Sequence, residues 1–137
     1  MSAATGRTVS VPRWMLWTGW LLSFVVVAQL LSSAWFRATY HTYAVAEIVT
    51  SYGYPESAIV PIVIAECTLV VLYVVPQTSV IAAILMTGYL GGAVATHLRV
   101  ADTARAAIPL VVGILAWAGL YLRDSRIRQL VPIRRSA

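Results

Sequence analysis

Four long apolar runs divide the chain, at residues 14–35, 57–75, 80–98 and 108–122, and polar stretches separate them. A bilayer core about 30 Å thick needs about 20 residues of helix per crossing, and flanking residues that reach the interface accommodate a somewhat shorter run. The pattern therefore predicts an all-α fold, a polytopic membrane four-helix bundle.

The first apolar run has the clearest boundaries of the four. Arg13 and Arg37 flank it. Trp14 and Trp35 stand near its two ends, where interfacial aromatic residues are expected. The run is much longer than the apolar core of about 7–15 residues in a signal peptide, so we interpret it as a retained helix.

The connections between the spans carry further signals. Residues 36–53 are mixed in polarity, with Tyr40, Ala44, Ile48 and Tyr52 at a spacing of four. This spacing predicts a short helix lying in the membrane interface between the first two spans. The second and third spans are joined by the short stretch 76–79, which permits a tight reversal, so we expect these two helices to be antiparallel neighbours.

The distribution of arginine predicts the orientation in the membrane. All 10 basic residues are arginines, and the net charge is +5. Arg7 and Arg13 precede the first span, and the side that they share with the C-terminus also has Arg123, Arg126, Arg128, Arg134 and Arg135. The opposite side has Arg37, Arg99 and Arg105. The positive-inside rule therefore places both termini in the cytoplasm.

This orientation divides the chain into three parts. They are a cytoplasmic N-terminal segment at 1–13, a membrane domain at 14–122 and a basic cytoplasmic tail at 123–137. We interpret the tail arginines as a topology signal and as a tether to anionic lipid, at about 1 kcal/mol per residue near the surface. A tail that docks a partner protein is the alternative.

Composition agrees with a membrane protein. Hydrophobic residues make up 60% of the chain and charged residues 11%, against about 45–50% and about 25% in a typical soluble domain. Cys67 is the single cysteine, which excludes an intrachain disulfide, a Cys-x-x-Cys pair and a thiolate metal cluster. Because no catalytic triad, phosphate-binding loop or nucleic-acid motif is readable, we expect no nucleic-acid partner and no catalysis by the chain alone.

Glu66 is an ionisable residue inside the second span, and such residues are functional-site candidates by default. At a rise of about 1.5 Å per residue it lies about 13 Å below the outer boundary. Isolation in lipid would favour its neutral form, whereas a neighbouring cation would favour the charged form, and both states stay open here. Tyr73, on the same helix face, is a candidate hydrogen-bond donor to it.

Polar side chains of three spans gather in the outer half of the predicted bundle. Gln29, Ser33 and Arg37 recur every four residues and form one stripe on the first helix. The predicted ligand pocket consists of Gln29, Ser33, Glu66, Tyr89, Thr96, His97 and Arg99, with Glu66 as its floor. Under the alternative interpretation, these groups satisfy one another as helix-packing hydrogen bonds, worth about 0.6 kcal/mol each.

Small residues occupy one face of the third span, within about 100° of arc at about 3.6 residues per turn. They are Gly88, Gly91, Gly92 and Ala95. Such a face lets a neighbouring backbone approach closely, so we predict helix packing there.

His41 and His97 are the two histidines of the chain, and both are predicted to lie on the outer side. A haem held by two imidazoles needs opposed ligands from facing elements, and a metal site usually needs further ligands. Haem is therefore disfavoured, and no metal site is predicted.

The segment LMTGYLGGAVATHLR at residues 85–99 resembles the signature of the DoxX-like family of small membrane proteins. Further matching elements are Gly53-Tyr54-Pro55, Glu66, Pro76, Thr78, Trp117 and the Tyr-Leu-Arg-Asp segment at 121–124. The resemblance covers about residues 52–124. The chain departs from the family pattern at Ser33, Ala34 and Arg37, where such proteins often have Gly and Lys, and at Val63 and Ala82, where glycine is expected.

The resemblance implies a four-helix bundle in the bacterial plasma membrane and a link to redox physiology. The wider DoxX group includes a subunit of a thiosulfate:quinone oxidoreductase, a mycobacterial membrane complex associated with oxidative-stress defence, and eukaryotic assembly chaperones. Because function lives in sites and not in folds, this implication is an association.

Three functions are consistent with these observations. The first is a non-catalytic accessory subunit that binds a quinone or another lipid-like ligand and supports a membrane or extracytoplasmic oxidoreductase partner. The second is an assembly protein that uses the glycine face of the third span to hold a partner helix. The third, a small transporter, lacks the inverted repeat and broken helices of such proteins, although a homo-oligomer would rescue it.

Overall fold

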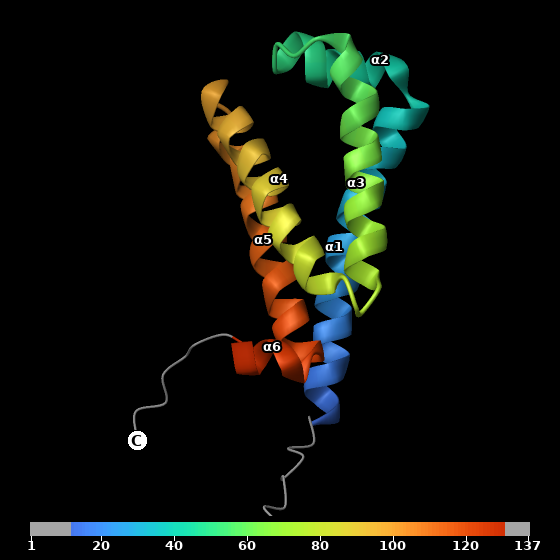
Figure 1. Cartoon of the computed structure of the whole chain (residues 1–137). Helices are drawn as coiled ribbons and strands as arrows, with labels where there is room; N and C mark the ends of the chain where they lie inside the picture. The colour runs from blue at the N-terminus through green and yellow to red at the C-terminus, as the bar shows by residue number, and fades with distance from the viewer. Residues whose placement is uncertain (1–11, 131–137) are drawn as a thin grey trace, which may run out of the picture.

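The computed structural model describes residues 12–130, and these residues are almost entirely helical (Figure 1). The elements in chain order are α1 (Arg13–Thr39), α2 (His41–Ala44), the π-helix η1 (Val45–Ser51), the 3₁₀-helix η2 (Glu56–Ala58), α3 (Ile59–Val74), α4 (Ser79–Arg99), α5 (Thr103–Arg123) and α6 (Ser125–Leu130). The predicted all-α fold class is confirmed.

Four helical segments are long and apolar enough to cross a membrane: Arg13–Thr39, Glu56–Val74, Ser79–Arg99 and Thr103–Arg123. Each long helix packs against two others, so that the order around the bundle is α1, α3, α4, α5. As predicted, α3 and α4 are neighbours in contact. Each of these helices is long enough to cross the hydrocarbon core of a bilayer. Each also satisfies its backbone hydrogen bonds internally, as a membrane-spanning segment must.

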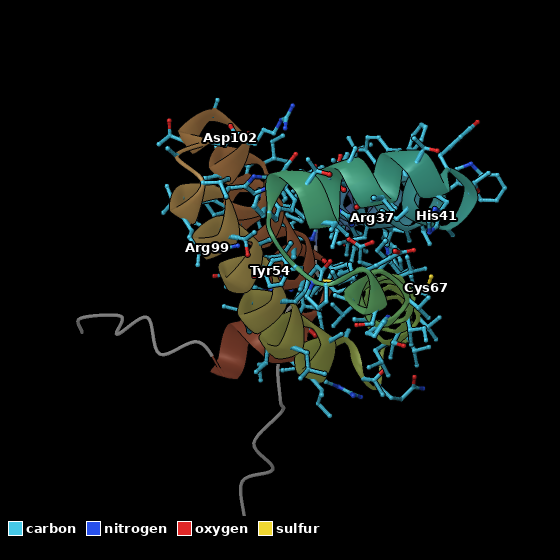
Figure 2. The ribbon with its side chains drawn as sticks, turned by 90° about the horizontal axis from the view of Figure 1, so that it is seen from above. Arg37, His41, Tyr54, Cys67, Arg99 and Asp102 are labelled. Atoms are coloured by element: carbon cyan, nitrogen blue, oxygen red, sulfur yellow. The ribbon has the colours of Figure 1, made fainter. Side chains whose placement is uncertain are left out.

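The bundle is tight at one end and divided at the other. Figure 1 shows the pair α1 and α3 diverging from the pair α4 and α5 towards the end that carries α2 and η1. We call this end the open end, and the opposite end, which α6 crosses, the α6 end. In the view from above, α2 and η1 lie across the open end, from His41 on one side to the neighbourhood of Tyr54 and Arg99 on the other (Figure 2).

The core is a narrow column of apolar side chains along the bundle axis. It includes Val26, Leu30, Leu69, Val70, Tyr73, Met86, Leu90, Val112 and Ala116. Many other apolar side chains point outwards, such as Val60, Ile81 and Leu110, each more than half exposed. This is the pattern expected where lipid is the solvent, because burial away from lipid gives no hydrophobic gain and packing decides which face turns inward.

A close backbone approach joins α1 and α5 near the α6 end. A Cβ atom placed on Gly19 would lie 2.9 Å from the carbonyl oxygen of Gly119, and one placed on Gly119 would lie 2.8 Å from Ser23 Oγ. Ser23 itself donates to the carbonyl of Gly19 at 2.8 Å. Neither position has room for a larger residue, so this contact fixes the distance between the two helices.

The glycine face of α4 is different. A Cβ atom on Gly88, Gly91 or Gly92 would meet nothing within 4 Å, and Ala95 is also exposed. No helix of residues 12–130 therefore packs closely on this face. The small residues form a surface that another helix can approach closely, but they do not determine which helix this is.

The boundaries near the open end differ from those predicted. Helix α1 continues past residue 35 to Thr39, and the short helix predicted over 36–53 is present with narrower bounds, as α2 and η1 over residues 41–51 after a break at Tyr40. Helix α5 begins before the predicted 108, because the Asp102 side chain caps it by accepting from Arg105 N at 3.1 Å. Ala101 makes the turn into this cap with a φ of 60°.

The segment interpreted as a basic tail contains a helix. Ile127 of α6 is 2% exposed and packs with Ala83 and Leu120 against the α6 end. Asp124 caps this helix by accepting from Arg126 N at 2.9 Å. A single apolar residue among arginines is a weak signal, which is why the sequence did not indicate the helix. Arg134 and Arg135 lie outside the described residues.

Candidate functional site

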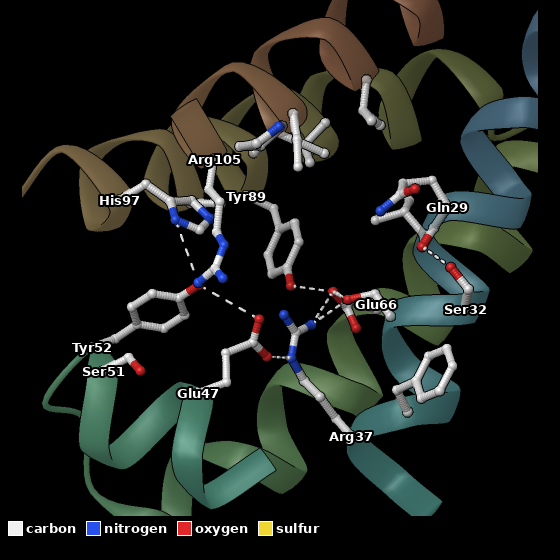
Figure 3. A pocket seen from close by; sticks show the side chains of 18 of the residues that line it. Gln29, Ser32, Arg37, Glu47, Ser51, Tyr52, Glu66, Tyr89, His97 and Arg105 are labelled. Atoms are coloured by element: carbon white, nitrogen blue, oxygen red, sulfur yellow. Dashed lines mark hydrogen bonds and ion pairs between the residues drawn. The ribbon is translucent and has the colours of Figure 1, made fainter. Parts of the chain in front are cut away.

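A cavity of about 480 Å³ lies at the open end and is lined by residues from both pairs of diverging helices. Its polar lining consists of Gln29, Ser32, Ser33, Arg37, Tyr43, Glu47, Ser51, Tyr52, Glu66, Tyr89, His97 and Arg105. Its apolar lining includes Leu30, Phe36, Leu90, Ile108 and Val112. Figure 3 shows side chains from α1, η1, α3, α4 and α5 converging on this space.

Glu66 joins three of the four spans at the floor of the cavity. Its side chain is 3% exposed. Its Oε1 accepts from Ser33 Oγ at 3.0 Å and from Arg37 Nη1 at 2.7 Å, both on α1. The same oxygen accepts from Tyr89 Oη on α4 at 2.7 Å. Of the two states left open by the sequence, the structure therefore has a cation beside the carboxylate.

Tyr73 does not take the role of donor to Glu66. Its hydroxyl donates to the carbonyl of Ala116 at 2.7 Å and lies 3.3 Å from Ser23 Oγ. Two turns of α3 separate it from Glu66, so the shared helix face brings Tyr73 towards α5 and α1 nearer the α6 end.

Arg37 is shared between two carboxylates. Its Nε donates to Glu47 Oε2 at 2.9 Å, and its Nη1 contacts Glu66 and Ser33. The side chains of Arg37 and Glu47 are 14% and 18% exposed. With both carboxylates ionised, this cluster has one positive and two negative charges, so it carries a net charge of −1. Burying such a group is tolerable because each charge has a partner.

The π-helix η1 places Glu47 and Tyr52 over the cavity. Its wide turn appears in the bond from Tyr52 N to the Glu47 carbonyl, at 3.1 Å. The Tyr52 hydroxyl lies 3.5 Å from both Glu47 Oε1 and His97 Nδ1, and its ring meets His97 edge-on (Figure 3). Burial, and then the Glu47 carboxylate, raise the pKa of Tyr52, so its hydroxyl stays neutral.

The structure brings together five of the seven residues predicted to form the pocket. Gln29, Ser33, Glu66, Tyr89 and His97 line the cavity, whereas Thr96 and Arg99 do not. On α4, Thr96 is turned by about 100° and Arg99 by about 200° from His97, and both contact the segment that follows η1 instead of the cavity.

Thr96 and Arg99 have a structural role beside the cavity. Thr96 Oγ1 hydrogen-bonds with Tyr54 Oη at 2.9 Å. Arg99 donates to the carbonyl of Tyr52 and lies over the Tyr54 ring, 5.5 Å from its centroid. Together they hold the segment that follows η1 against α4.

Seven polar lining residues were absent from the predicted set: Ser32, Arg37, Tyr43, Glu47, Ser51, Tyr52 and Arg105. Arg37 continues the stripe of Gln29 and Ser33, so the spacing of four did indicate it, although we interpreted it as a flank of the span. Glu47 and Tyr52 are five residues apart, a spacing that meets on one face in a π-helix and not in an α-helix.

The C-terminal arginines that the structure describes divide into two kinds. Arg123 donates to the carbonyl of Tyr73 at 2.7 Å and lies over the rings of Trp20 and Tyr73, at 4.8 and 4.6 Å from their centroids. This residue packs against the bundle. Arg126 is exposed on α6, and Arg128 lies near it with its Nη1 4.0 Å from Met15 Sδ.

The two histidines are used separately. His41 pairs with Glu56 at 2.9 Å on an exposed surface, whereas His97 lines the cavity. Within residues 12–130 no group of three or more His, Cys, Asp and Glu side chains is arranged to hold a metal ion.

These features define a helical membrane protein with four spans and a polar cavity at one end of the bundle. The chain belongs to the DoxX-like family, whose family model matches residues 16–119. The predicted resemblance is therefore confirmed, and the match also includes most of α1, where the motif comparison found departures. Comparison with curated proteins gave no match, and neither did comparison with solved structures.

We expect Arg37→Leu to destabilise the protein strongly, by about 3–5 kcal/mol, because it leaves the buried Glu66 and Glu47 carboxylates without a cation. The measurement is thermal unfolding in mild detergent. Arg105→Leu is the matched control, since this exposed arginine pairs with Asp102 at 3.4 Å and exposed pairs contribute little. Equal effects of the two substitutions would contradict a structural role for the shared ion pair.

Proposed function

We propose that this DoxX-like membrane protein is a non-catalytic accessory subunit of a membrane oxidoreductase and that it binds a quinone or a similar lipid-like ligand in the cavity. The observation that carries the proposal is the combination of a polar floor with apolar walls. Glu66, Arg37 and Tyr89 gather at one place, and the opposite walls include Leu90 and Val112. A quinone head group needs a few such partners at the end of an apolar slot.

The size of the cavity and its surroundings support an amphiphilic ligand. Its volume of about 480 Å³ falls within the range of about 300–1,000 Å³ that is usual for ligand pockets. Phe36 and Ile108 line the cavity and are each 50% exposed. An apolar tail can therefore leave the cavity beside these two side chains and continue into the lipid.

As an accessory subunit, this chain binds the quinone, and a partner protein carries out the electron transfer. Support comes from the wider DoxX group, which includes a subunit of a thiosulfate:quinone oxidoreductase. The partner would be a membrane or extracytoplasmic oxidoreductase that exchanges electrons with the bound quinone.

For the orientation, we propose that the open end faces outwards from the bacterial plasma membrane and that both termini are cytoplasmic. The arginine count supports this. Among the described residues the α6 end has Arg13, Arg123, Arg126 and Arg128, and the open end has Arg37, Arg99 and Arg105. The cavity would then open to the side on which an extracytoplasmic partner works.

A second candidate function is membrane assembly, in which the glycine face of α4 holds a helix of a partner protein. The observation in its favour is that Gly88, Gly91 and Gly92 are exposed and that added Cβ atoms there meet nothing within 4 Å. A face free of neighbours inside the bundle is available for close packing with another chain.

A short-chain benzoquinone should raise the melting temperature of the purified protein, by an amount equivalent to about 2.7 kcal/mol when its concentration is a hundred times Kd. Ala93→Phe fills the cavity from α4 and should abolish this shift, whereas Ala95→Phe, on the exposed side of the same helix, should retain it. Thermal unfolding and titration calorimetry measure both. A melting-temperature shift that persists in Ala93→Phe would show that the ligand binds outside this cavity.

Replacing Gly92 by Ile should abolish co-purification of a partner helix if the second function holds, because the branched side chain blocks close approach. Under the first function, the same variant should still bind quinone. Affinity purification in mild detergent, with mass spectrometry of proteins and lipids, distinguishes the two. Glu66→Gln serves as the reciprocal variant and should leave a partner at the glycine face in place.

The orientation is tested by cysteine labelling in intact cells, with the native Cys67 replaced by Ala. A membrane-impermeant maleimide should label Thr42→Cys, which is exposed in α2, and should leave Ser125→Cys at the start of α6 unlabelled. The reverse pattern would place the open end in the cytoplasm.

A further inference from the structure

One buried atom of the cavity floor has no partner. Glu66 Oε2 is buried and accepts no hydrogen bond among residues 12–130, whereas Oε1 of the same carboxylate accepts three. Buried polar atoms are nearly always hydrogen-bonded, so an unpaired carboxylate oxygen in a cavity wall points to a group that the chain itself does not supply.

The surrounding charges show which kind of group fits. Arg37 already pairs with both Glu47 and Glu66, so an anion placed at Oε2 would meet a carboxylate whose cation is already shared. Glu66 forms an ion pair with Arg37, whose Nη1 lies 2.7 Å from Oε1. An ionised oxygen accepts hydrogen bonds and cannot donate one. The missing partner is therefore a hydrogen-bond donor.

We propose that the head group bound in this cavity donates a hydrogen bond to Glu66 Oε2, so that the site prefers a quinol to the corresponding quinone. The inference rests on the proposed function and specifies the redox form of its ligand. Glu66 is among the residues that line the cavity, and Oε2 is the oxygen of its carboxylate that lacks a donor.

A quinol hydroxyl can donate a hydrogen bond, whereas a quinone carbonyl can only accept one. The hydroxyl can donate to Glu66 Oε2 and can also accept from the Arg37 guanidinium, which uses Nε and Nη1 in its contacts with protein. The carbonyl can accept from Arg37 but leaves Oε2 unpaired. Hydrogen bonds to charged groups are the stronger class, so the quinol should bind about tenfold more tightly or better.

This preference has a redox consequence. Tighter binding of the reduced form raises the midpoint potential of the bound couple. For a two-electron couple, a tenfold ratio of dissociation constants corresponds to about 30 mV and about 1.4 kcal/mol. A site with this property retains the product of quinone reduction and releases the oxidised form.

The test compares three ligands with the purified full-length protein in mild detergent without oxygen. They are a decyl-substituted benzoquinone, its quinol, and the dimethyl ether of that quinol, which has no donor and resists oxidation. We expect the quinol to have a Kd at least about tenfold below those of the other two. Equal affinities, or tighter binding of the quinone, overturn the inference while leaving the proposed function in place; binding of none of them overturns both.

Glu66→Gln gives a second expectation. Its amide oxygen can keep the donors of Ser33, Arg37 and Tyr89, while its NH₂ group takes the place of Oε2 and donates. Because a quinone carbonyl and a quinol hydroxyl can both accept from this amide, the variant should lose the preference for the quinol. Glu56→Gln, a matched change at an exposed site outside the cavity, should keep the quinol preference. An unchanged preference in Glu66→Gln would contradict a role for Oε2, and the comparison in the native protein decides the matter if that variant does not fold.

Discussion

The ion pair between Arg37 and Glu66 is the interaction around which the open end is organised. In a low-dielectric interior neither charge is stable alone, so each must find a partner of good geometry. The ion pair joins Arg37 on α1 to Glu66 on α3, and Glu66 also accepts a hydrogen bond from Tyr89 on α4. Arg37 also joins η1 to the bundle through Glu47. Four elements are thus held together where the helices diverge and apolar packing is thinnest.

Most of the fold could be predicted from the sequence because the bilayer imposes a length and a polarity on each span. The ends of the spans were less predictable, because local capping decides them. Asp102 starts α5 early, and Ile127 folds α6 back on the bundle. The contact between Gly19 and Gly119 was not predictable, because neither glycine belongs to a Gly-x-x-x-Gly spacing in its helix, whereas the α4 glycines form such a pattern and have no neighbour within the described residues.

The part of the candidate site that lies on the α-helical spans was predictable from the spacing of its residues. Gln29 and Ser33 share a stripe at a spacing of four, and a carboxylate in a hydrocarbon span stands out in any sequence. The roof of the cavity was not predictable, because η1 has π-helical spacing and its residues align five apart. Thr96 and Arg99 were included because they are polar and near His97, although adjacent positions on a helix face different directions.

The tight contact at Gly19 and Gly119 lies far along α1 from the cavity. Eighteen residues separate Gly19 from Arg37 in one continuous helix, a distance of about 27 Å at about 1.5 Å per residue. A tilt of about 5° at the glycine contact displaces the far end of such a rod by about 2 Å. Any substitution that changed the crossing angle at the two glycines would therefore be amplified at the open end, where α1 lines the cavity.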